Sequence, residues 1–252
     1  MKDLRALMDE YPGTTTVGEI GDDNPLERMA EYTAGGDKLH MAYTFDLLNT
    51  PHSARYIHEV LERFQRLAGD AWPCWATSNH DVVRSATRWG AGEDPTAYPK
   101  VALAMLCSLR GSVCLYQGEE LGLPEADVPF ERIQDPYGKV LWPEFKGRDG
   151  CRTPMPWSDS EHGGFSSVEP WLPMEASHRD LAVSRQQDDA NSTLNALRTM
   201  LAFRRQHPAL FDGDLTLVDV GETLLGFTRQ KGMKRCYAFS TSPPRLRRLA
   251  CH

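Results

Sequence analysis

The sequence lacks a long apolar run and has no dense group of basic residues. Its longest apolar run, VALAMLCSL at 101–109, is far shorter than the roughly 20 residues that a membrane-spanning helix needs. The N-terminus, MKDLRALMDEYPG, is acidic and amphipathic and contains no apolar signal segment. The formal net charge is -7, and the only basic run is the tail PPRLRRLACH, whereas phosphate binding needs clustered Lys and Arg. We therefore expect a soluble, cytoplasmic protein with no nucleic-acid and no membrane partner.

The sequence also lacks the spacings that mark a metal site. None of its 6 cysteines forms a CxxC pair or a Cys/His ligand pattern, and its 8 histidines are not clustered. We expect no metal and no cofactor. A chain of 252 residues does not depend on disulfides for its stability, so the cysteines are interpreted as reduced thiols of a cytoplasmic protein.

Strand-like and helix-like segments alternate along the chain. Short β-branched or apolar runs predict strands at 14–20, 39–48, 72–78 and 112–118. Helical spacing predicts helices at 51–69, 95–111 and 192–210, the first of which ends at Gly69. Helices between consecutive strands imply parallel crossovers and an α/β fold. Composition and pattern do not distinguish a closed barrel from an open sheet.

Two further regions complete the expected organisation. The segment from about 121 to 184 is rich in Pro, Gly and Trp, and so long a loop in a compact protein is usually functional or disordered. After residue 210, short strands are expected, with turns at Gly221 and Gly232. We expect an α/β domain over 1–209, including the long loop, and a smaller β domain over 210–252.

Polar residues gather where the predicted strands end. A closed α/β barrel and an open parallel sheet both bind their ligands at the edge where the strands end. Glu119 and Glu120 are interpreted as structural, because acids at such a position commonly orient loops or accept hydrogen bonds from backbone N–H groups. The residues at the four strand ends are Glu19, then Phe45 and Asp46, then Asn79, His80 and Asp81, and finally Glu119 and Glu120.

Four motifs together resemble glycoside hydrolase family 13, the α-amylase superfamily. They are VGEI at 17–20, SNHDVVR at 78–84, GSVCLYQGEELG at 111–122 and FKGRDGCRTPMPW at 145–157. The last is similar to the bacterial α-glucosidase branch, and the resemblance runs from about Lys2 to about Ser242. It implies an eight-stranded TIM (β/α)8 barrel followed by a β-sandwich domain, and retaining hydrolysis of glycosidic bonds.

The resemblance also implies roles for single residues. Glu19 matches the catalytic acid/base, and Asp81 matches the second aspartate, which stabilises the transition state. His80 matches a residue that bonds the sugar hydroxyls, Arg148 an arginine that lines the sugar pocket, and Phe45 an aromatic residue near the acid/base. The chemistry agrees, because a glycosidic oxygen leaves only once protonated and an oxocarbenium-like transition state favours a nearby carboxylate.

The family's nucleophile is an aspartate in a motif resembling GFRxD, and the sequence contains no such motif. The four predicted strands correspond to strands 5–8 of the barrel. We therefore expect the second half of a TIM barrel, followed by the start of a truncated C-terminal β-sandwich whose tail, from about 243, is unlike the family.

The expected function is that of a fragment of a retaining α-glucosidase. Its parent hydrolyses or transfers terminal α-glucosyl units of short, maltose-like α-linked oligosaccharides, and the chain alone is expected to be inactive. Whether this chain is itself an enzyme stays open. The alternative is a non-catalytic protein that binds sugar or completes a barrel with another chain. Since a half-barrel exposes the edges of its outer strands, self-association is expected.

Overall fold

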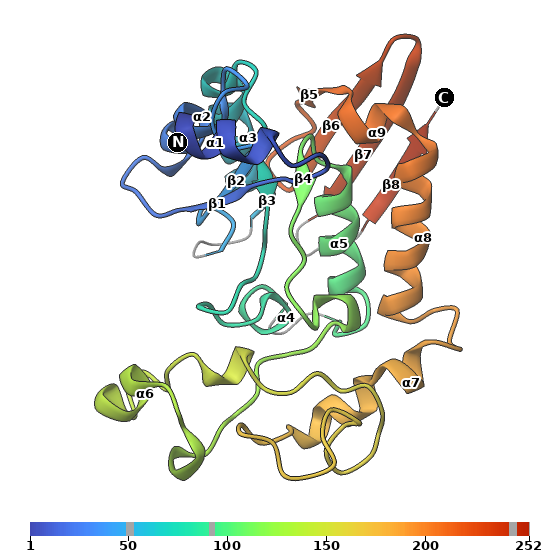
Figure 1. Ribbon diagram of the computed structural model, residues 1–252. Coiled ribbons are helices and arrows are strands. Elements are labelled where there is room, and N and C mark those ends of the chain that lie inside the picture. Colours follow the sequence, from blue (N-terminus) through green and yellow to red (C-terminus); the bar gives the residue numbers. More distant parts are fainter. Residues whose placement is uncertain (49–52, 91–93, 242–245, 252) are drawn as a thin grey trace. The chain divides into compact units, whose positions relative to one another are not determined.

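The computed structural model describes residues 1–48, 53–90, 94–241 and 246–251 (Figure 1). The chain forms two compact units. The first consists of Met1–Thr77, Met105–Cys114 and Phe203–His252, and the second of Ser78–Ala104 and Leu115–Ala202. Two helices, α5 (Tyr98–Ser108) and α8 (Thr193–Gln206), contribute residues to both units.

The first unit contains the parallel strands that the sequence predicts. Strand β1 (Val17–Ile20) pairs in parallel with β2 (Met41–Thr44), and β3 (Cys74–Trp75) pairs in parallel with β4 (Ser112–Val113). A parallel bridge between Ala42 and Pro73 connects the two pairs. All four predicted strands are confirmed in their order, but each is shorter than its apolar run because only a few residues form ladder hydrogen bonds.

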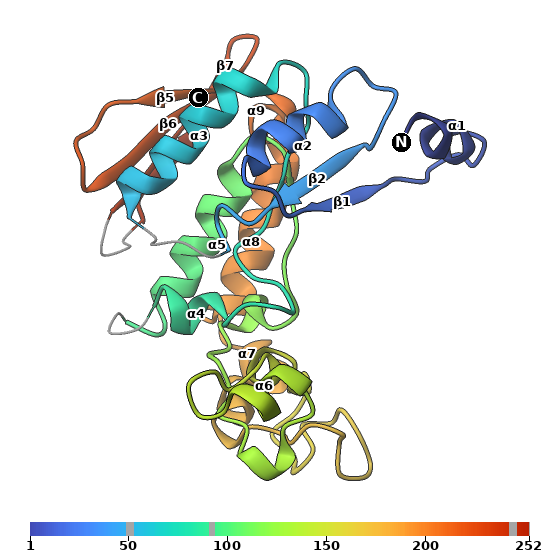
Figure 2. The same cartoon turned by 90° about the vertical axis from the view of Figure 1, so that its left-hand side faces the viewer.

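Three helices accompany these strands: α1 (Lys2–Asp9), α2 (Pro25–Thr33) and α3 (Ala54–Ala68). The side chain of Ser53 caps α3 by accepting the Tyr56 N–H at 3.0 Å, and Gly69 ends it with φ of 52°. Helix α3 buries its apolar stripe and contacts strand β6 of the C-terminal sheet (Figure 2). The sequence interpretation named no helix at 25–33, where α2 lies.

Four antiparallel strands form the C-terminal sheet of the first unit. They are β5 (Asp214–Val218), β6 (Leu224–Lys231), β7 (Lys234–Thr241) and β8 (Leu246–Cys251), paired in that order and preceded by α9 (Pro208–Asp212). The turns at Gly221 and Gly232 are confirmed by their φ of 87° and 59°. The part of the atypical tail that the structure describes continues this sheet as β8, whereas the sequence interpretation let the chain depart from the sandwich there.

Two arginines, Arg229 of β6 and Arg204 of α8, donate hydrogen bonds to carbonyl oxygens at and just after the C-terminal end of α5. Arg229 is fully buried and donates to the carbonyl oxygens of Ser108 at 2.8 Å and Gly213 at 2.9 Å. Arg204 donates to the carbonyl oxygen of Gly111 at 2.7 Å. Because the last carbonyls of a helix have no partner within it, these cations satisfy and stabilise the end of α5.

The cysteines depart in one respect from the expectation of reduced thiols. Cys74, Cys107, Cys114 and Cys151 are free. Cys236, however, is disulfide-bonded, and its neighbour across the β7–β8 ladder is Cys251. The expectation was therefore wrong for Cys236, which belongs to no recognisable cysteine spacing in the sequence.

The second unit holds the segment predicted as a long loop. It contains several short helices, among them α6 (Pro136–Leu141) and α7 (Val183–Gln186), together with α4 (Ser85–Arg88) from the preceding segment. Its apolar cluster consists of Leu121, Leu123, Met155 and Leu194. Across both units, the described helices are too short or too polar to cross a membrane.

We expect Gly111→Ala to destabilise the first unit. Gly111 has φ of 125°, and a Cβ there would lie 2.6 Å from both the carbonyl oxygen and Cγ of Pro73. Strain and overlap together should lower the free energy of unfolding by more than about 2 kcal/mol. The matched control is Gly13→Ala, where φ is 82° and no heavy atom lies within 4 Å. Strain alone should cost about 1 kcal/mol there. Equal urea midpoints for the two variants would contradict this expectation.

Candidate active site

The turn that carries Asp81 is built by local hydrogen bonds in the second unit. The side-chain Oδ1 of Asn79 accepts the Asp81 N–H at 2.9 Å, and Ser78 Oγ accepts the Ser85 N–H at 3.0 Å. Asn79 thus has the turn role that its residue type favours. Its Nδ2 is buried and has no hydrogen-bond partner in the described part of the chain. The turn fixes the backbone so that the Asp81 side chain projects beyond it.

One oxygen of the Asp81 carboxylate collects all the hydrogen bonds that its side chain makes. Oδ1 accepts from Arg148 Nη1 at 3.0 Å and from Arg152 Nη2 at 2.8 Å, and His80 Nε2 lies 3.5 Å away. No donor within the described ranges bonds Oδ2. The Asp81 side chain is 37% exposed. The carboxylate is therefore anchored through one oxygen and retains the other as an acceptor.

Asp135 holds Arg148 in place. Its side chain is fully buried and accepts Arg148 Nε at 2.8 Å, Nη2 at 3.1 Å and the main-chain N–H at 2.9 Å. The hydrogen bonds from Arg148 lower the pKa of Asp135 to about 2, and Asp135 in turn raises the pKa of the guanidinium. Asp149 accepts the N–H groups of Gln134 and Asp135 instead, so it orders the same loop without pairing with Arg148.

A short 3₁₀ turn, Asp149–Cys151, separates Arg148 from Arg152. The carbonyl oxygen of its last residue, Cys151, accepts from Arg84 Nη2 at 2.8 Å and from Tyr116 Oη at 3.0 Å. Arg84 also donates to the carbonyl oxygen of Gln117 at 2.7 Å. Arg84 therefore ties three segments of the second unit together.

Glu19 and Phe45 both belong to the first unit. Glu19 is exposed on β1, in register with Tyr43 of β2, and within the described residues its carboxylate has no hydrogen-bond partner. Phe45 follows β2 and is half-buried; a Cβ on Gly21 would lie 3.0 Å from its ring. The aromatic ring thus packs beside the end of β1, two residues beyond Glu19.

The structure thus brings Asp81, His80 and Arg148 together in the second unit, whereas Glu19 and Phe45 belong to the first. Sequence reasoning missed Asp135 and Arg152. The sequence signal for Arg152 was its position four residues after Arg148 in the motif GRDGCR. Asp135 stands in DPYG, which was interpreted only as a turn.

The structural interpretation of Glu119 and Glu120 is confirmed. Glu119 is buried and accepts the Tyr116 N–H at 2.8 Å and the Ser85 hydroxyl at 3.2 Å. Glu120 accepts the Gly118 N–H at 2.7 Å. Both carboxylates order the chain after β4. Within the described ranges, no group of three or more His, Cys, Asp or Glu side chains could hold a metal ion.

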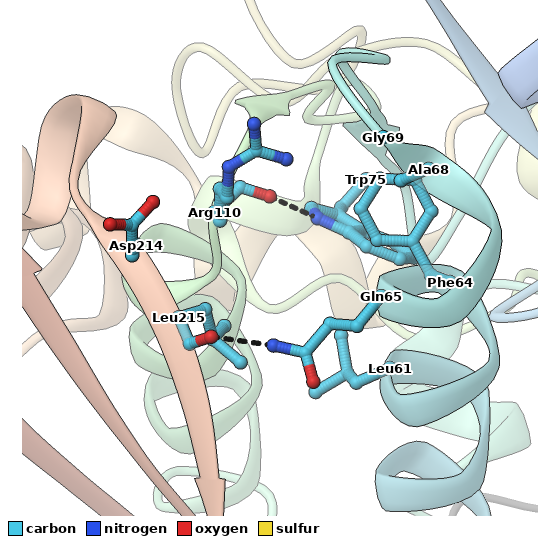
Figure 3. A pocket seen from close by; sticks show the side chains of 9 residues that line it. All are labelled: Leu61, Phe64, Gln65, Ala68, Gly69, Trp75, Arg110, Asp214 and Leu215. Carbon is cyan, nitrogen blue, oxygen red and sulfur yellow. Dashed lines mark hydrogen bonds between the residues drawn. The ribbon is translucent and has the colours of Figure 1, made fainter.

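A cavity of about 320 Å³ lies within the first unit, between α3 and β5 (Figure 3). Trp75 forms one wall and donates from its indole N–H to the carbonyl oxygen of Arg110 at 2.7 Å, while Gln65 Nε2 donates to the carbonyl oxygen of Leu215 at 2.5 Å. None of the predicted site residues lines the cavity. Its walls combine apolar side chains with the polar residues Gln65, Arg110 and Asp214, and we interpret it as a packing gap between helix and sheet.

Comparisons with known proteins agree with the family that the four sequence motifs resemble. A family model described as "Alpha amylase, catalytic domain" matches residues 1–213. A protein of Rhizobium meliloti (strain 1021) named "Probable alpha-glucosidase" is 49% identical over 240 residues, which is 94% of this chain and 44% of that protein. An "Oligo-1,6-glucosidase" of Parageobacillus thermoglucosidasius is 26% identical over 85% of this chain and 43% of its own length.

Solved structures show the same likeness. The crystal structure of an alpha-glucosyl transfer enzyme, XgtA, matches this chain with a TM-score of 0.91 and 53% sequence identity. The match covers 95% of this chain and 45% of that one. Structures of a trehalulose synthase, MutB, match with a TM-score of 0.83 at 21% identity, which supports the fold alone. The chain spans about half the length of the curated relatives it matches.

Proposed function

Because the chain belongs to the alpha-amylase catalytic-domain family, we propose that it carries part of the active site of an α-glucosidase or α-glucosyl-transfer enzyme. The substrate class is short oligosaccharides with terminal α-linked glucose, such as maltose. The observation that carries the proposal is the Asp81 carboxylate, which is anchored through Oδ1 by two arginines and retains Oδ2 as an acceptor. The 53% sequence identity between this chain and an alpha-glucosyl transfer enzyme supports the same substrate class.

The proposed roles follow from the chemistry of acetal cleavage. Glu19 donates a proton to the departing glycosidic oxygen, and its exposed carboxyl group is accessible for that step. Asp81 Oδ2 and His80 bond the sugar hydroxyls and strengthen their grip as the ring flattens toward the oxocarbenium-like transition state. Arg148, already oriented by Asp135, lines the sugar pocket, and Phe45 forms a wall beside Glu19.

We further propose that the chain does not turn over α-glucosides alone. Retention of configuration requires a carboxylate nucleophile about 5 to 5.5 Å from the acid, and no segment of the sequence has the nucleophile motif. In this proposal the chain contributes strands 5–8 of the barrel. The strands that carry the nucleophile belong to another polypeptide segment.

The test is hydrolysis of p-nitrophenyl α-glucoside by two samples. The chain alone should release no p-nitrophenol. The second sample mixes the chain with the fragment of the alpha-glucosyl transfer enzyme to which the chain does not align, and this mixture should hydrolyse the glucoside. The positive control mixes that same fragment with the remaining, aligned fragment of the alpha-glucosyl transfer enzyme. Turnover by the chain alone that disappears in Asp81→Asn would show that another residue acts as nucleophile. An inactive mixture beside an active control would contradict the proposal.

A second candidate function is a non-catalytic one, in which the chain completes a barrel with another protein. The exposed apolar face of α1 favours it, since Leu4 is 42% and Leu7 is 50% exposed and α1 buries none of its residues. Strand β1 pairs only with β2 among the described strands, so its other edge can accept a partner.

We expect the isolated chain to self-associate through this surface. An unpaired parallel edge and an uncovered apolar helix face both favour association with another copy. Sedimentation velocity over a range of concentrations should therefore show species larger than the 28.3 kDa monomer. A single, stable monomer at every concentration would contradict the expectation. Leu4→Glu together with Leu7→Glu should shift the distribution toward monomer.

A further inference from the structure

We propose that Arg152 is a positioning residue that orients the Asp81 carboxylate and the backbone before it. Its guanidinium donates from Nη2 to Asp81 Oδ1 at 2.8 Å and from Nε to the carbonyl oxygen of His80 at 2.7 Å. One planar group thus holds both the side chain of Asp81 and the peptide that precedes it. The proposal rests on the proposed function, in which Asp81 bonds the sugar.

The two arginines that bond Asp81, Arg148 and Arg152, have different second partners. Arg148 divides its guanidinium between Asp135 and Asp81. Arg152 bonds only His80 and Asp81 within the described part of the chain. The 3₁₀ turn Asp149–Cys151 places Arg148 at its N-terminal cap and Arg152 at its C-terminal cap, so that both reach the same oxygen.

This arrangement fixes which carboxylate oxygen faces a ligand. A carboxylate bonded at one oxygen only by Arg148 can rotate about its terminal torsion and exchange the two oxygens. The second bond from Arg152 and its link to the His80 carbonyl oppose that rotation. Because the guanidinium fork is rigid, lysine can replace its charge but cannot make both bonds with the same geometry.

The experiment is a double-mutant cycle on the binding of 1-deoxynojirimycin, a glucose analogue with a protonated ring nitrogen, to the full chain by isothermal titration calorimetry. Arg152→Met should weaken binding about tenfold in the native background and less than about twofold in the Asp81→Asn background. Arg152→Lys should fall between native and Arg152→Met. The matched control is Arg132→Met, which removes an arginine paired at 2.6 Å with the exposed Glu169 and should leave the affinity unchanged.

The outcomes separate this proposal from the proposed function. If Asp81→Asn leaves the affinity unchanged, or the native chain does not bind the analogue, the proposed function is wrong. If Asp81→Asn weakens binding but Arg152→Met has no effect, or an equal effect in both backgrounds, the positioning role is wrong. A purely structural role of Arg152 predicts that equal effect.

A measurement without ligand tests the same geometry. In ¹H–¹⁵N spectra, the Nε–H of Arg152 should give a signal protected from solvent exchange by its bond to the His80 carbonyl, and Asp81→Asn should shift it. The signal should disappear in Arg152→Lys, which assigns it. An Nε–H that exchanges freely, or one that Asp81→Asn does not shift, would overturn the proposal even for a chain that binds no sugar.

Discussion

Replacing Glu19 by glutamine is expected to slow the hydrolysis of maltose by the mixed barrel described above by at least about 10²-fold. Glutamine has nearly the same shape but cannot donate a proton to the departing oxygen. General acid catalysis typically contributes about 10²- to 10⁴-fold, and we expect a loss of kcat/KM in that range for maltose. The loss should be much smaller for p-nitrophenyl α-glucoside, because p-nitrophenolate departs without protonation.

This dependence on the leaving group separates an acid from a residue that only binds or stabilises. A structural defect lowers kcat/KM for both substrates by the same factor. The control is Glu27→Gln on α2, which changes an exposed carboxylate of the same unit and should leave both rates unchanged. An equal loss on maltose and on p-nitrophenyl α-glucoside would contradict the acid role of Glu19.

Removing the carboxylate of Asp135 should have the largest effect on the stability of the second unit. Its buried side chain accepts three hydrogen bonds from Arg148 and one from the Tyr137 N–H at 3.2 Å. Removing one partner of a buried ion pair costs about 3 to 5 kcal/mol where the other charge is left uncompensated. Arg148 is 27% exposed and keeps its hydrogen bond to Asp81, so Asp135→Ala should lower the free energy of unfolding by less than that, about 2 kcal/mol. The variant should also release Arg148 from its position beside Asp81.

The pH dependence of stability has a definite sign at this residue. The pKa of Asp135 is lowered from 3.8 to about 2 by its bonds with Arg148, so the folded state favours the ionised form. The resulting stabilisation of about 2 kcal/mol is fully present above pH 3.8 and is lost as the pH falls toward 2. Asp135→Ala should remove this part of the acid dependence of urea unfolding.

Asp127→Asn is the matched control for this variant. Asp127 pairs with Lys146 at 2.6 Å, but its side chain is 76% exposed. Such surface pairs contribute at most about 1 kcal/mol, and the control should unfold nearly as the native chain does. Equal stability of the Asp135 and Asp127 variants would show that the bonds to Arg148 do not stabilise the fold.

The sequence predicted the elements whose signals are local. The strand order followed from short apolar runs, and α3 from its apolar spacing between Ser53 and Gly69. The turn at Asn79 also has a local signal, because Asn readily bonds its own backbone, although the sequence analysis did not predict it. Helix α2 was missed although Pro25 at its start and buried residues at 26, 29, 30 and 33 carry a helical pattern. The helix is only 9 residues long, and the stronger signals of the strands before and after it masked this pattern.

The rest of the site depends on contacts between distant positions. Arg152 and Asp81 are 71 residues apart, and Arg148 and Asp135 are 13 apart across a segment that offers other carboxylates as partners. Arg148 could equally have paired with the adjacent Asp149, and only the folded loop shows that it does not. Family resemblance indicated Asp81 and Arg148, but only the folded structure shows which groups hold them.

The central claim is that the Asp81 carboxylate bonds a sugar through Oδ2 while two arginines anchor Oδ1. The most direct test is titration of 1-deoxynojirimycin into the native chain, Asp81→Asn and the control Glu27→Gln. The claim predicts that Asp81→Asn weakens binding and that the control does not. Unchanged affinity in Asp81→Asn, with the variant folded, would contradict the claim.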